Sequence, residues 1–214
     1  MGPVPRRLMQ IGFAPRIGAL IFAFALLASG CSQQAKLALL PADAVVLAFG
    51  DSLTFGTGAN ENESYPAQLA RLTGRRVLRE GIPGEVSAAG LERLPALLDE
   101  HRPRLLLLCH GGNDFLRRLP KDKAAENLRA MIRLAKDRGI DVLLIGTPEM
   151  GFTLTPPDFY ASIAKEFKLP YEGDVLTKIL RDSTLKADQV HPNAQGYRLM
   201  AERVADLLRK SGAI

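Results

Sequence analysis

Cysteine and histidine are scarce in this sequence, and their scarcity argues against two kinds of site. Cys31 and Cys109 are the only cysteines among 214 residues. Because Cys31 directly follows an export-type leader, described below, the one remaining thiol has no partner for an internal disulfide. The chain has three histidines and no Asp-x-His after its first predicted strand, which falls well short of the ligands of a metallophosphoesterase. We therefore expect no disulfide, no metal and no other cofactor.

The body of the chain also lacks linkers, repeats and basic stripes. No Pro/Gly/Ser-rich stretch divides it, and 47% of the residues are hydrophobic, which is enough for one full-sized core. Of the net charge of +5, three units come from Arg6, Arg7 and Arg16, in a leader without acidic residues. Elsewhere basic and acidic residues are interleaved, and no basic stripe alternates with aromatic side chains. These features predict one globular domain, expected to be monomeric, that does not bind nucleic acid.

The first thirty residues have the layout of a secretory leader. After the basic stretch, the apolar run Ile17–Ala28 is shorter than the roughly 20 residues of a transmembrane helix. Small residues follow, and the letters LASGC that end at Cys31 resemble a bacterial lipobox. This resemblance implies that residues 1–30 are removed, that Cys31 becomes a lipid-bearing N-terminus, and that residues 31–43 tether a domain at 44–214. An ordinary cleaved signal and an uncleaved anchor are the alternatives.

The resemblance to lipoprotein signals also predicts a location. Ser32, rather than an aspartate, follows Cys31, and by resemblance to enterobacterial sorting this favours the outer membrane. The N-terminal lipid would then anchor the domain in the bacterial cell envelope. We expect the domain to face the periplasm, beside phospholipids and other esters.

Short apolar runs alternate with amphipathic segments after Pro41. Five of the runs are predicted as strands: Ala44–Phe49, Arg76–Leu78, Arg104–Cys109, Ile140–Ile145 and Pro170–Glu172. Five segments are predicted as helices: Ser64–Leu72, Val86–Glu100, Ala124–Arg138, Ala161–Phe167 and Asn193–Lys210. In the second helix we expect one side to pack inward: Ala89, Leu94, Leu97 and Leu98. This alternation predicts an α/β fold whose parallel sheet is covered by helices on both faces.

Polar or glycine-rich segments lie where the predicted strands end, which is where such sheets bind ligands. Gly50–Leu53 (GDSL) follows the first strand, Gly81–Gly84 (GIPG) the second, and Gly111–Asp114 (GGND) the third. A fourth segment, Asp188–Pro192 (DQVHP), precedes the last helix. The pattern predicts that all four meet at one edge of the sheet.

Acyl transfer needs a nucleophile, a base and a group that orients the base, and these segments supply all three. Ser52 stands at a strand-to-helix turn. His191 is the best base, because His101 lies in a polar segment and His110, next to GGND, is a weaker candidate. Asp188 lies three residues before His191, so one loop can hold the carboxylate against Nδ1 and leave Nε2 for the serine.

The reaction also needs donors for the developing oxyanion, and a glycine N–H and an asparagine amide suit this role. Gly84 and Asn113 are the candidates, with the Ser52 amide as a third. Asp51 and Asp114 are interpreted as structural residues that hydrogen-bond within their own loops. Each of these residue types alone is common in caps and turns, so the prediction depends on all the segments meeting together.

The four segments, in identity, order and strand context, resemble the blocks of the SGNH (GDSL) hydrolase family. The stretch from Gly84 to Leu98 is most similar to the periplasmic thioesterase, lysophospholipase and arylesterase branch. The resemblance implies a three-layer α/β/α sandwich with a mostly parallel, flavodoxin-like sheet. It also implies a serine hydrolase that cleaves carboxylic esters, thioesters or lysophospholipids through an acyl-enzyme. The residues carried over are the triad Ser52, Asp188 and His191, and the oxyanion-hole residues Ser52, Gly84 and Asn113.

Two other function classes stay open. A metallophosphoesterase also carries GD and GN blocks after strands, and a lipid-anchored envelope binding protein could keep an inactive hydrolase fold. Nucleotide binding and a lipase-type elbow fit less well, because GDSLTFGTG has no phosphate-loop lysine and no G-x-S-x-G is present. The segment Gly146–Tyr160, with Met150, Phe152 and Leu154, either sets substrate specificity or packs as a surface loop.

Overall fold

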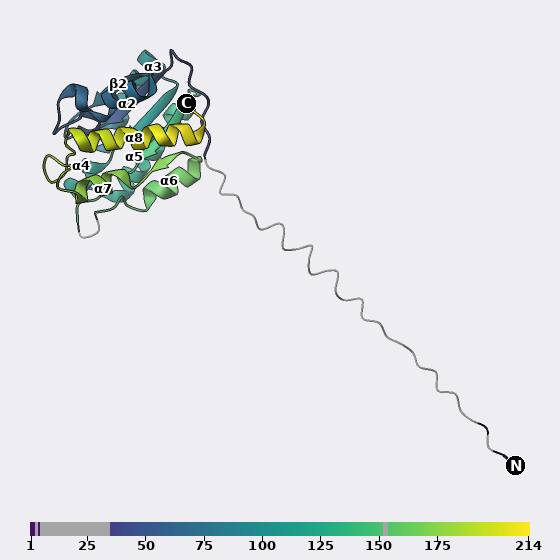
Figure 1. Cartoon of the computed structure of the whole chain (residues 1–214). Helices are drawn as coiled ribbons and strands as arrows, with labels where there is room; N and C mark the ends of the chain where they lie inside the picture. The colour runs from purple at the N-terminus through teal and green to yellow at the C-terminus, as the bar shows by residue number, and fades with distance from the viewer. Residues whose placement is uncertain (3, 5–34, 152–153) are drawn as a thin grey trace. The chain divides into compact units, whose positions relative to one another are not determined.

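Strands and helices alternate along the chain and build a parallel sheet between two layers of helices (Figure 1). The computed structural model describes residues 35–151 and 154–214, together with residues 1, 2 and 4. The strands are β1 (Val45–Gly50), β2 (Arg76–Gly81), β3 (Leu105–Cys109), β4 (Asp141–Ile145) and β5 (Tyr171–Glu172). The helices are α1 (Ser52–Phe55), α2 (Tyr65–Thr73), α3 (Ser87–His101), α4 (Gly112–Leu116), α5 (Lys121–Lys136), α6 (Phe159–Phe167), α7 (Val175–Arg181) and α8 (Ala194–Ser211), with a 3₁₀ turn η1 at Glu61–Glu63.

Neighbouring strands of the described sheet are all parallel, in the order β2-β1-β3-β4-β5. This is the flavodoxin-like order, in which the chain moves to one side of β1 and then to the other. The fold class predicted from the sequence is therefore confirmed. Such a sheet places its ligand crevice beyond the carboxyl ends of β1 and β3.

Alternate side chains of the central strands pack against different helical layers. Val46 and Ala48 of β1 belong to a core with α2, α7 and α8, whereas Leu47 and Phe49 belong to a core with α3, α5 and α6. In Figure 1, α8 lies across the first of these faces. Because both faces are covered, the strands read as continuous apolar runs, as LLLLC in β3 does.

The structure corrects one predicted helix face. In α3 the buried residues are Ser87, Gly90, Leu94 and Leu98, whereas Ala89 is exposed. Leu97 is half-buried. The helix turns Gly90 inward because a buried histidine ring, described below, lies directly against it. Three short helices, α1, α4 and α7, were not among the predicted elements.

Several predictions fall on residues outside the described ones. These are the leader at residues 1–30 apart from residues 1, 2 and 4, the lipidation site Cys31, the sorting residue Ser32, and Phe152. Part of the predicted tether is described: the N–H of Leu37 donates to the Ser211 carbonyl at 3.0 Å, and that of Leu40 to the Ala213 carbonyl at 2.8 Å. Within the described residues, no helix is both long and apolar enough to cross a membrane.

Candidate active site

Ser52 begins helix α1 directly after the first strand. The cap of this helix is the neighbouring residue, because the Asp51 carboxylate accepts the N–H of Leu53 at 3.1 Å. Asp51 therefore takes the capping role that a serine at such a turn often plays. The Ser52 hydroxyl instead hydrogen-bonds a histidine from the far end of the chain.

That histidine, His191, is held by a short loop before α8. Lys186 and Pro192 form an antiparallel bridge, and the Ala187 N–H donates to the His191 carbonyl at 2.9 Å. The Asp188 Oδ1 atom accepts the main-chain N–H groups of Val190 and His191, each at 2.8 Å. These contacts fix the carboxylate and the imidazole relative to each other.

The three predicted triad side chains form one hydrogen-bonded series. His191 Nδ1 lies 2.7 Å from Asp188 Oδ2, and His191 Nε2 lies 3.0 Å from Ser52 Oγ. Because an ionised carboxylate only accepts, the imidazole proton is on Nδ1, and Nε2 is free to accept the serine hydroxyl proton. This is the arrangement of a nucleophile, its base and the group that orients the base.

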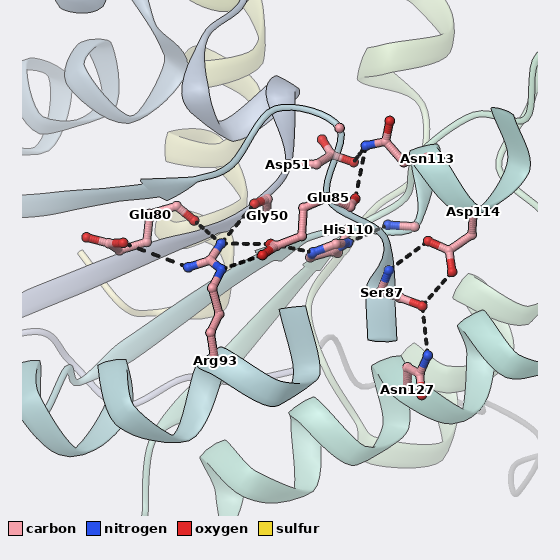
Figure 2. Close-up of polar contacts among 12 residues, drawn as sticks. Gly50, Asp51, Glu80, Glu85, Ser87, Arg93, His110, Asn113, Asp114 and Asn127 are labelled. Carbon is pink, nitrogen blue, oxygen red and sulfur yellow. Dashed lines mark hydrogen bonds and ion pairs between the residues drawn. The ribbon is translucent and has the colours of Figure 1, made fainter. Parts of the chain in front are cut away.

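The two other oxyanion-hole candidates lie beside Ser52. Gly84 has a φ of +78°, which favours glycine, and it lies in the loop between β2 and α3. Asn113, in the first turn of α4, donates through Nδ2 to the main-chain carbonyl of Glu85 at 3.0 Å and to Asp51 Oδ2 at 3.2 Å (Figure 2). Gly84, Asn113 and Ser52 line the same cavity.

This cavity has a volume of about 270 Å³ and opens over Ser52 and His191. Its walls are mostly apolar: Leu53, Leu116, Met150, Leu180 and Val190. Met150 belongs to the segment predicted to set specificity or to pack at the surface, and its side chain reaches the cavity wall. A concave, mostly apolar pocket with a few polar groups at one end is typical of a small-molecule site.

The sequence from residue 48 to residue 199 matches the GDSL-like Lipase/Acylhydrolase family. This range contains all of the residues just described. The chain belongs to that family.

Several characterised proteins are similar to this GDSL-family chain. Esterase TesA of Pseudomonas aeruginosa is 31% identical over 202 residues, covering 86% of this chain and 98% of that protein. The thioesterase 1/protease 1/lysophospholipase L1 of Escherichia coli K12 is 30% identical over 172 residues, covering 77% and 83% of the two chains. An arylesterase of Vibrio mimicus is 31% identical and covers 77% of this chain and 88% of that protein.

Solved structures agree with the family assignment. The crystal structure of TesA superposes with a TM-score of 0.68 at 28% identity, covering 78% of this chain and 99% of that one. The esterase EstA of Pseudoalteromonas superposes with a TM-score of 0.67 at 25% identity, covering 78% and 98%. The fold is therefore that of the SGNH hydrolases, and the chain belongs to the TesA-, thioesterase- and arylesterase-like branch.

The two aspartates interpreted as structural behave differently. Asp51 does bond within its own loop, but its second oxygen also contacts Asn113. Its burial raises the pKa of the carboxyl, although the nearby histidines and the Leu53 N–H act against that rise. Asp114 was expected to bond within its loop; instead it accepts the Ser87 N–H at 2.8 Å and hydroxyl at 2.6 Å, joining the loops after β2 and β3.

The remaining histidines and the second cysteine of this GDSL-family chain lie apart from Ser52. His101 is the last residue of α3. His110 is fully buried and contacts Glu85 and the Gly111 N–H, a role that sequence reasoning missed. Cys109 is buried, as expected, and burial raises the pKa of its thiol strongly. Among the described residues, no group of three or more His, Cys, Asp or Glu side chains is placed to hold a metal ion.

Proposed function

We propose that this protein is a serine hydrolase that cleaves carboxylic esters through an acyl-enzyme on Ser52. The observation that carries the proposal is the hydrogen-bonded series from Ser52 Oγ through the His191 imidazole to the Asp188 carboxylate. Family membership supports the same reaction class, since the matched family consists of GDSL-like lipases and acylhydrolases. Binding alone does not require a serine hydroxyl aligned with an oriented imidazole.

In the proposed reaction, Ser52 Oγ attacks the ester carbonyl carbon while its proton passes to His191 Nε2. The Asp188 carboxylate stabilises the resulting imidazolium. The tetrahedral adduct collapses, the ester C–O bond breaks, and His191 returns the proton to the leaving alcohol. A water molecule, deprotonated by the same nitrogen, then attacks the acyl-enzyme, and collapse of the second adduct releases the acid and restores the Ser52 hydroxyl.

The negative charge on the carbonyl oxygen would be stabilised by the Ser52 and Gly84 amides and the Asn113 side chain. All three residues line the cavity. In the free protein the Asn113 amide has two acceptors, the Glu85 carbonyl at 3.0 Å and Asp51 at 3.2 Å. The longer contact, to Asp51, is the one that an oxyanion would share or replace. Removal of one such donor costs about 100- to 1,000-fold in kcat.

The cavity walls support a proposal for the substrate class. The apolar side chains around Ser52, among them Leu53, Leu116 and Val190, suit an acyl chain rather than a sugar or a charged group. The names of the relatives cover esterase, thioesterase and lysophospholipase. We infer that the chain acts on small-molecule or lipid esters, including thioesters and lysophospholipids, without a cofactor.

The decisive experiment is labelling with a fluorophosphonate probe, which reacts only with an activated serine. We expect wild type to be labelled and to hydrolyse p-nitrophenyl esters. Ser52→Ala should lose the label and lower kcat/KM by about 10,000-fold or more, with an unchanged Tm. Ser183→Ala, at an exposed serine of a surface turn, is the matched control. It should keep both the fluorophosphonate label and the ester hydrolysis of wild type. An unlabelled, inactive wild type would favour the alternative of a non-catalytic envelope binding protein.

The location is the second part of the proposal. The lipobox-like LASGC supports lipidation of Cys31, removal of residues 1–30 and a tether at residues 31–43. Ser32 supports the outer membrane as the destination, with the domain at 44–214 in the periplasm as a monomer. Lipid esters of the envelope would then be within reach of the proposed activity.

A further inference from the structure

Three side chains beside the proposed oxyanion hole form a buried polar network that the reaction itself does not use (Figure 2). At its centre is the Glu85 carboxylate, whose side chain is only 6% exposed. Arg93 donates to it twice, through Nε at 2.7 Å and through a terminal nitrogen at 2.9 Å. His110 Nε2 lies 3.1 Å from the same carboxylate. A buried charge with this many partners is stable only while the partners stay in place.

The hydrogen bonds of His110 determine which ring nitrogen carries its proton. Nδ1 accepts the N–H of Gly111 at 3.0 Å, so it carries no hydrogen of its own. The proton is therefore on Nε2, which donates it to Glu85. The His110 imidazole thus links the main chain of Gly111, at the start of the GGND segment, to the side chain of Glu85.

Arg93 extends the network to the ends of two further strands. One of its terminal nitrogens also donates to the carbonyls of Gly50, at 3.2 Å, and Glu80, at 3.0 Å. Gly50 precedes the segment that carries Ser52, and Glu80 lies at the end of β2. Its guanidinium also lies over the Phe49 ring, 4.2 Å from the centroid. The network therefore links the carboxyl ends of β1, β2 and β3.

The link to the oxyanion hole runs through the main chain of Glu85. Its carbonyl accepts the Asn113 amide at 3.0 Å, while its side chain is held by His110 and Arg93. A shift of the Glu85 main chain would move the acceptor that orients the Asn113 side chain, and the side-chain contacts with His110 and Arg93 oppose such a shift. On the other side of Asn113, the contacts of Asp114 with Ser87 hold the same two loops together.

We propose that Glu85, His110 and Arg93 are positioning residues that hold the Asn113 amide and the Gly84 loop in place for the oxyanion. This inference rests on the proposed hydrolase function. None of the three needs to touch the reacting atoms, since they act by fixing the acceptor that orients Asn113. Misplacement of a catalytic group by about 1 Å can cost 100-fold in rate.

The packing around His110 leaves no room for an alternative ring position toward α3. A Cβ atom built on Gly90 would lie 2.4 Å from His110 Nε2. The ring also lies 5.8 Å from the Phe49 ring, centroid to centroid. A hydroxyl of Tyr160 binds the His110 carbonyl at 2.6 Å. These contacts restrict the position of His110, which suits a positioning role.

The test compares His110→Leu with His110→Gln. The leucine removes both ring hydrogen bonds, whereas the Gln amide nitrogen stands as many bonds from Cβ as Nε2 and can still donate to Glu85. We expect His110→Leu to lower kcat/KM for a p-nitrophenyl ester by about 10- to 100-fold, with KM within about threefold. The affinity for an alkyl boronic acid, whose adduct places an oxygen in the oxyanion hole, should fall in proportion. His110→Gln should recover most of the loss, and His101→Leu is the control.

A double-mutant cycle then separates positioning from general damage. If His110 acts through Asn113, adding His110→Leu to Asn113→Ala should cost no more than about threefold further. Full additivity, or wild-type activity of a folded His110→Leu, would overturn the proposal. If His110→Leu does not fold, Arg93→Met can replace it in the double-mutant cycle with Asn113→Ala. The Arg93 side chain is 21% exposed, so this substitution disturbs the packing less. An inactive, unlabelled wild type would instead contradict the proposed function itself.

Discussion

At the scale of single residues, Asp188 has two separate tasks that one carboxylate can perform together. Oδ1 accepts two main-chain N–H groups and shapes the loop, while Oδ2 accepts His191 Nδ1. Partial burial raises the pKa of this carboxyl, but the hydrogen bonds from His191 and from the two N–H groups outweigh it. The pKa of Asp188 is consequently below its ordinary value. The carboxylate therefore stays ionised at neutral pH, as the orienting group of a triad must.

This division of tasks makes Asp188→Asn an informative change. The oxygen of the new amide must face the N–H groups of Val190 and His191, because an amide NH₂ cannot accept them. The NH₂ group then faces His191 Nδ1 and forces the ring proton onto Nε2, the atom that has to accept the Ser52 proton. We expect kcat to fall about 1,000- to 10,000-fold with Tm nearly unchanged, measured with a soluble ester.

Asp182→Asn is a close control for that substitution. Asp182 also accepts a main-chain N–H two residues ahead, that of Thr184 at 2.9 Å, but it lies outside the triad. The Asp182→Asn variant should hydrolyse esters as fast as wild type. Asp188→Asn with kcat within tenfold of wild type would show that His191 does not depend on this carboxylate.

At the scale of elements, the strands were predictable because their signal is local. Apart from Asp141 at the start of β4, the runs in β1, β3 and β4 carry no polar side chain, which is what burial on both faces of a sheet requires. Helix α8 was equally clear, with Asn193 as the expected cap: its side chain accepts the Gly196 N–H at 3.0 Å. Helices α1 and α4 are four and five residues long, too short to show a helical period.

The polar network between elements could not be read from the sequence. Glu85, Arg93 and His110 come from a loop, a helix and a strand end up to 25 residues apart. Nothing local marks them as partners, since a carboxylate and an arginine eight residues apart are normally solvated surface residues. For His110, the sequence shows only that it borders GGND. Its contact with Glu85 depends on α3, where Gly90 leaves room for the imidazole ring.

Glu85 also gives this network a pH dependence. Burial raises the pKa of its carboxyl, but the hydrogen bonds from His110 and Arg93 outweigh burial, so the pKa lies below the ordinary 4.5. A lowered pKa means that ionisation of Glu85 stabilises the folded protein above about pH 4.5. That contribution is lost as the pH falls through the lowered value.

We therefore expect the Tm of wild type to exceed that of Glu85→Gln at pH 7, and the gap to narrow below about pH 4.5. A charged hydrogen bond is worth about 1.5–3 kcal/mol, which corresponds to roughly 3–12 °C for a chain of this size. Asp51, whose pKa is raised, has the opposite pH dependence, but it is present in both proteins and largely cancels in the difference. Thermal unfolding from pH 3.5 to 7 measures this gap. A gap that is constant with pH would mean that Glu85 contributes no ionised carboxylate.

At the scale of the whole molecule, the sheet order brings the parts of the site together from distant segments. Ser52 follows β1 and Asn113 follows β3, and these strands are neighbours although β2 and α3 separate them in sequence. The topological switch between the two strands opens the crevice there. Asp188 and His191 reach the same crevice from the loop before α8.

The chain enters this domain at the end of the sheet opposite the catalytic candidates. The N–H groups of Leu37 and Leu40 donate to Ser211, the last residue of α8, and to Ala213 just beyond it. The Ala38 N–H donates to Asp141, the first residue of β4, at 2.9 Å. The catalytic candidates lie past the carboxyl ends of the strands. A lipid on Cys31 would therefore be joined to the domain through the chain that leads to Leu37, at the end of the sheet away from the catalytic candidates.

Because of this geometry, we expect Cys31→Ser to change membrane attachment without changing catalytic activity. Once its leader has been removed, the variant should be lost from the membrane fraction, because it lacks the proposed lipid that holds the protein there. Its kcat/KM for a water-soluble ester should stay within about twofold of the lipidated protein, since Leu37–Leu40 still pair with the C-terminus and the catalytic edge lies at the other end of the strands. Mass spectrometry of the mature N-terminus and fractionation measure the first effect, and ester hydrolysis by purified proteins measures the second. An exported, processed Cys31→Ser protein that still sediments with membranes would contradict the lipid anchor and leave the hydrolase proposal intact.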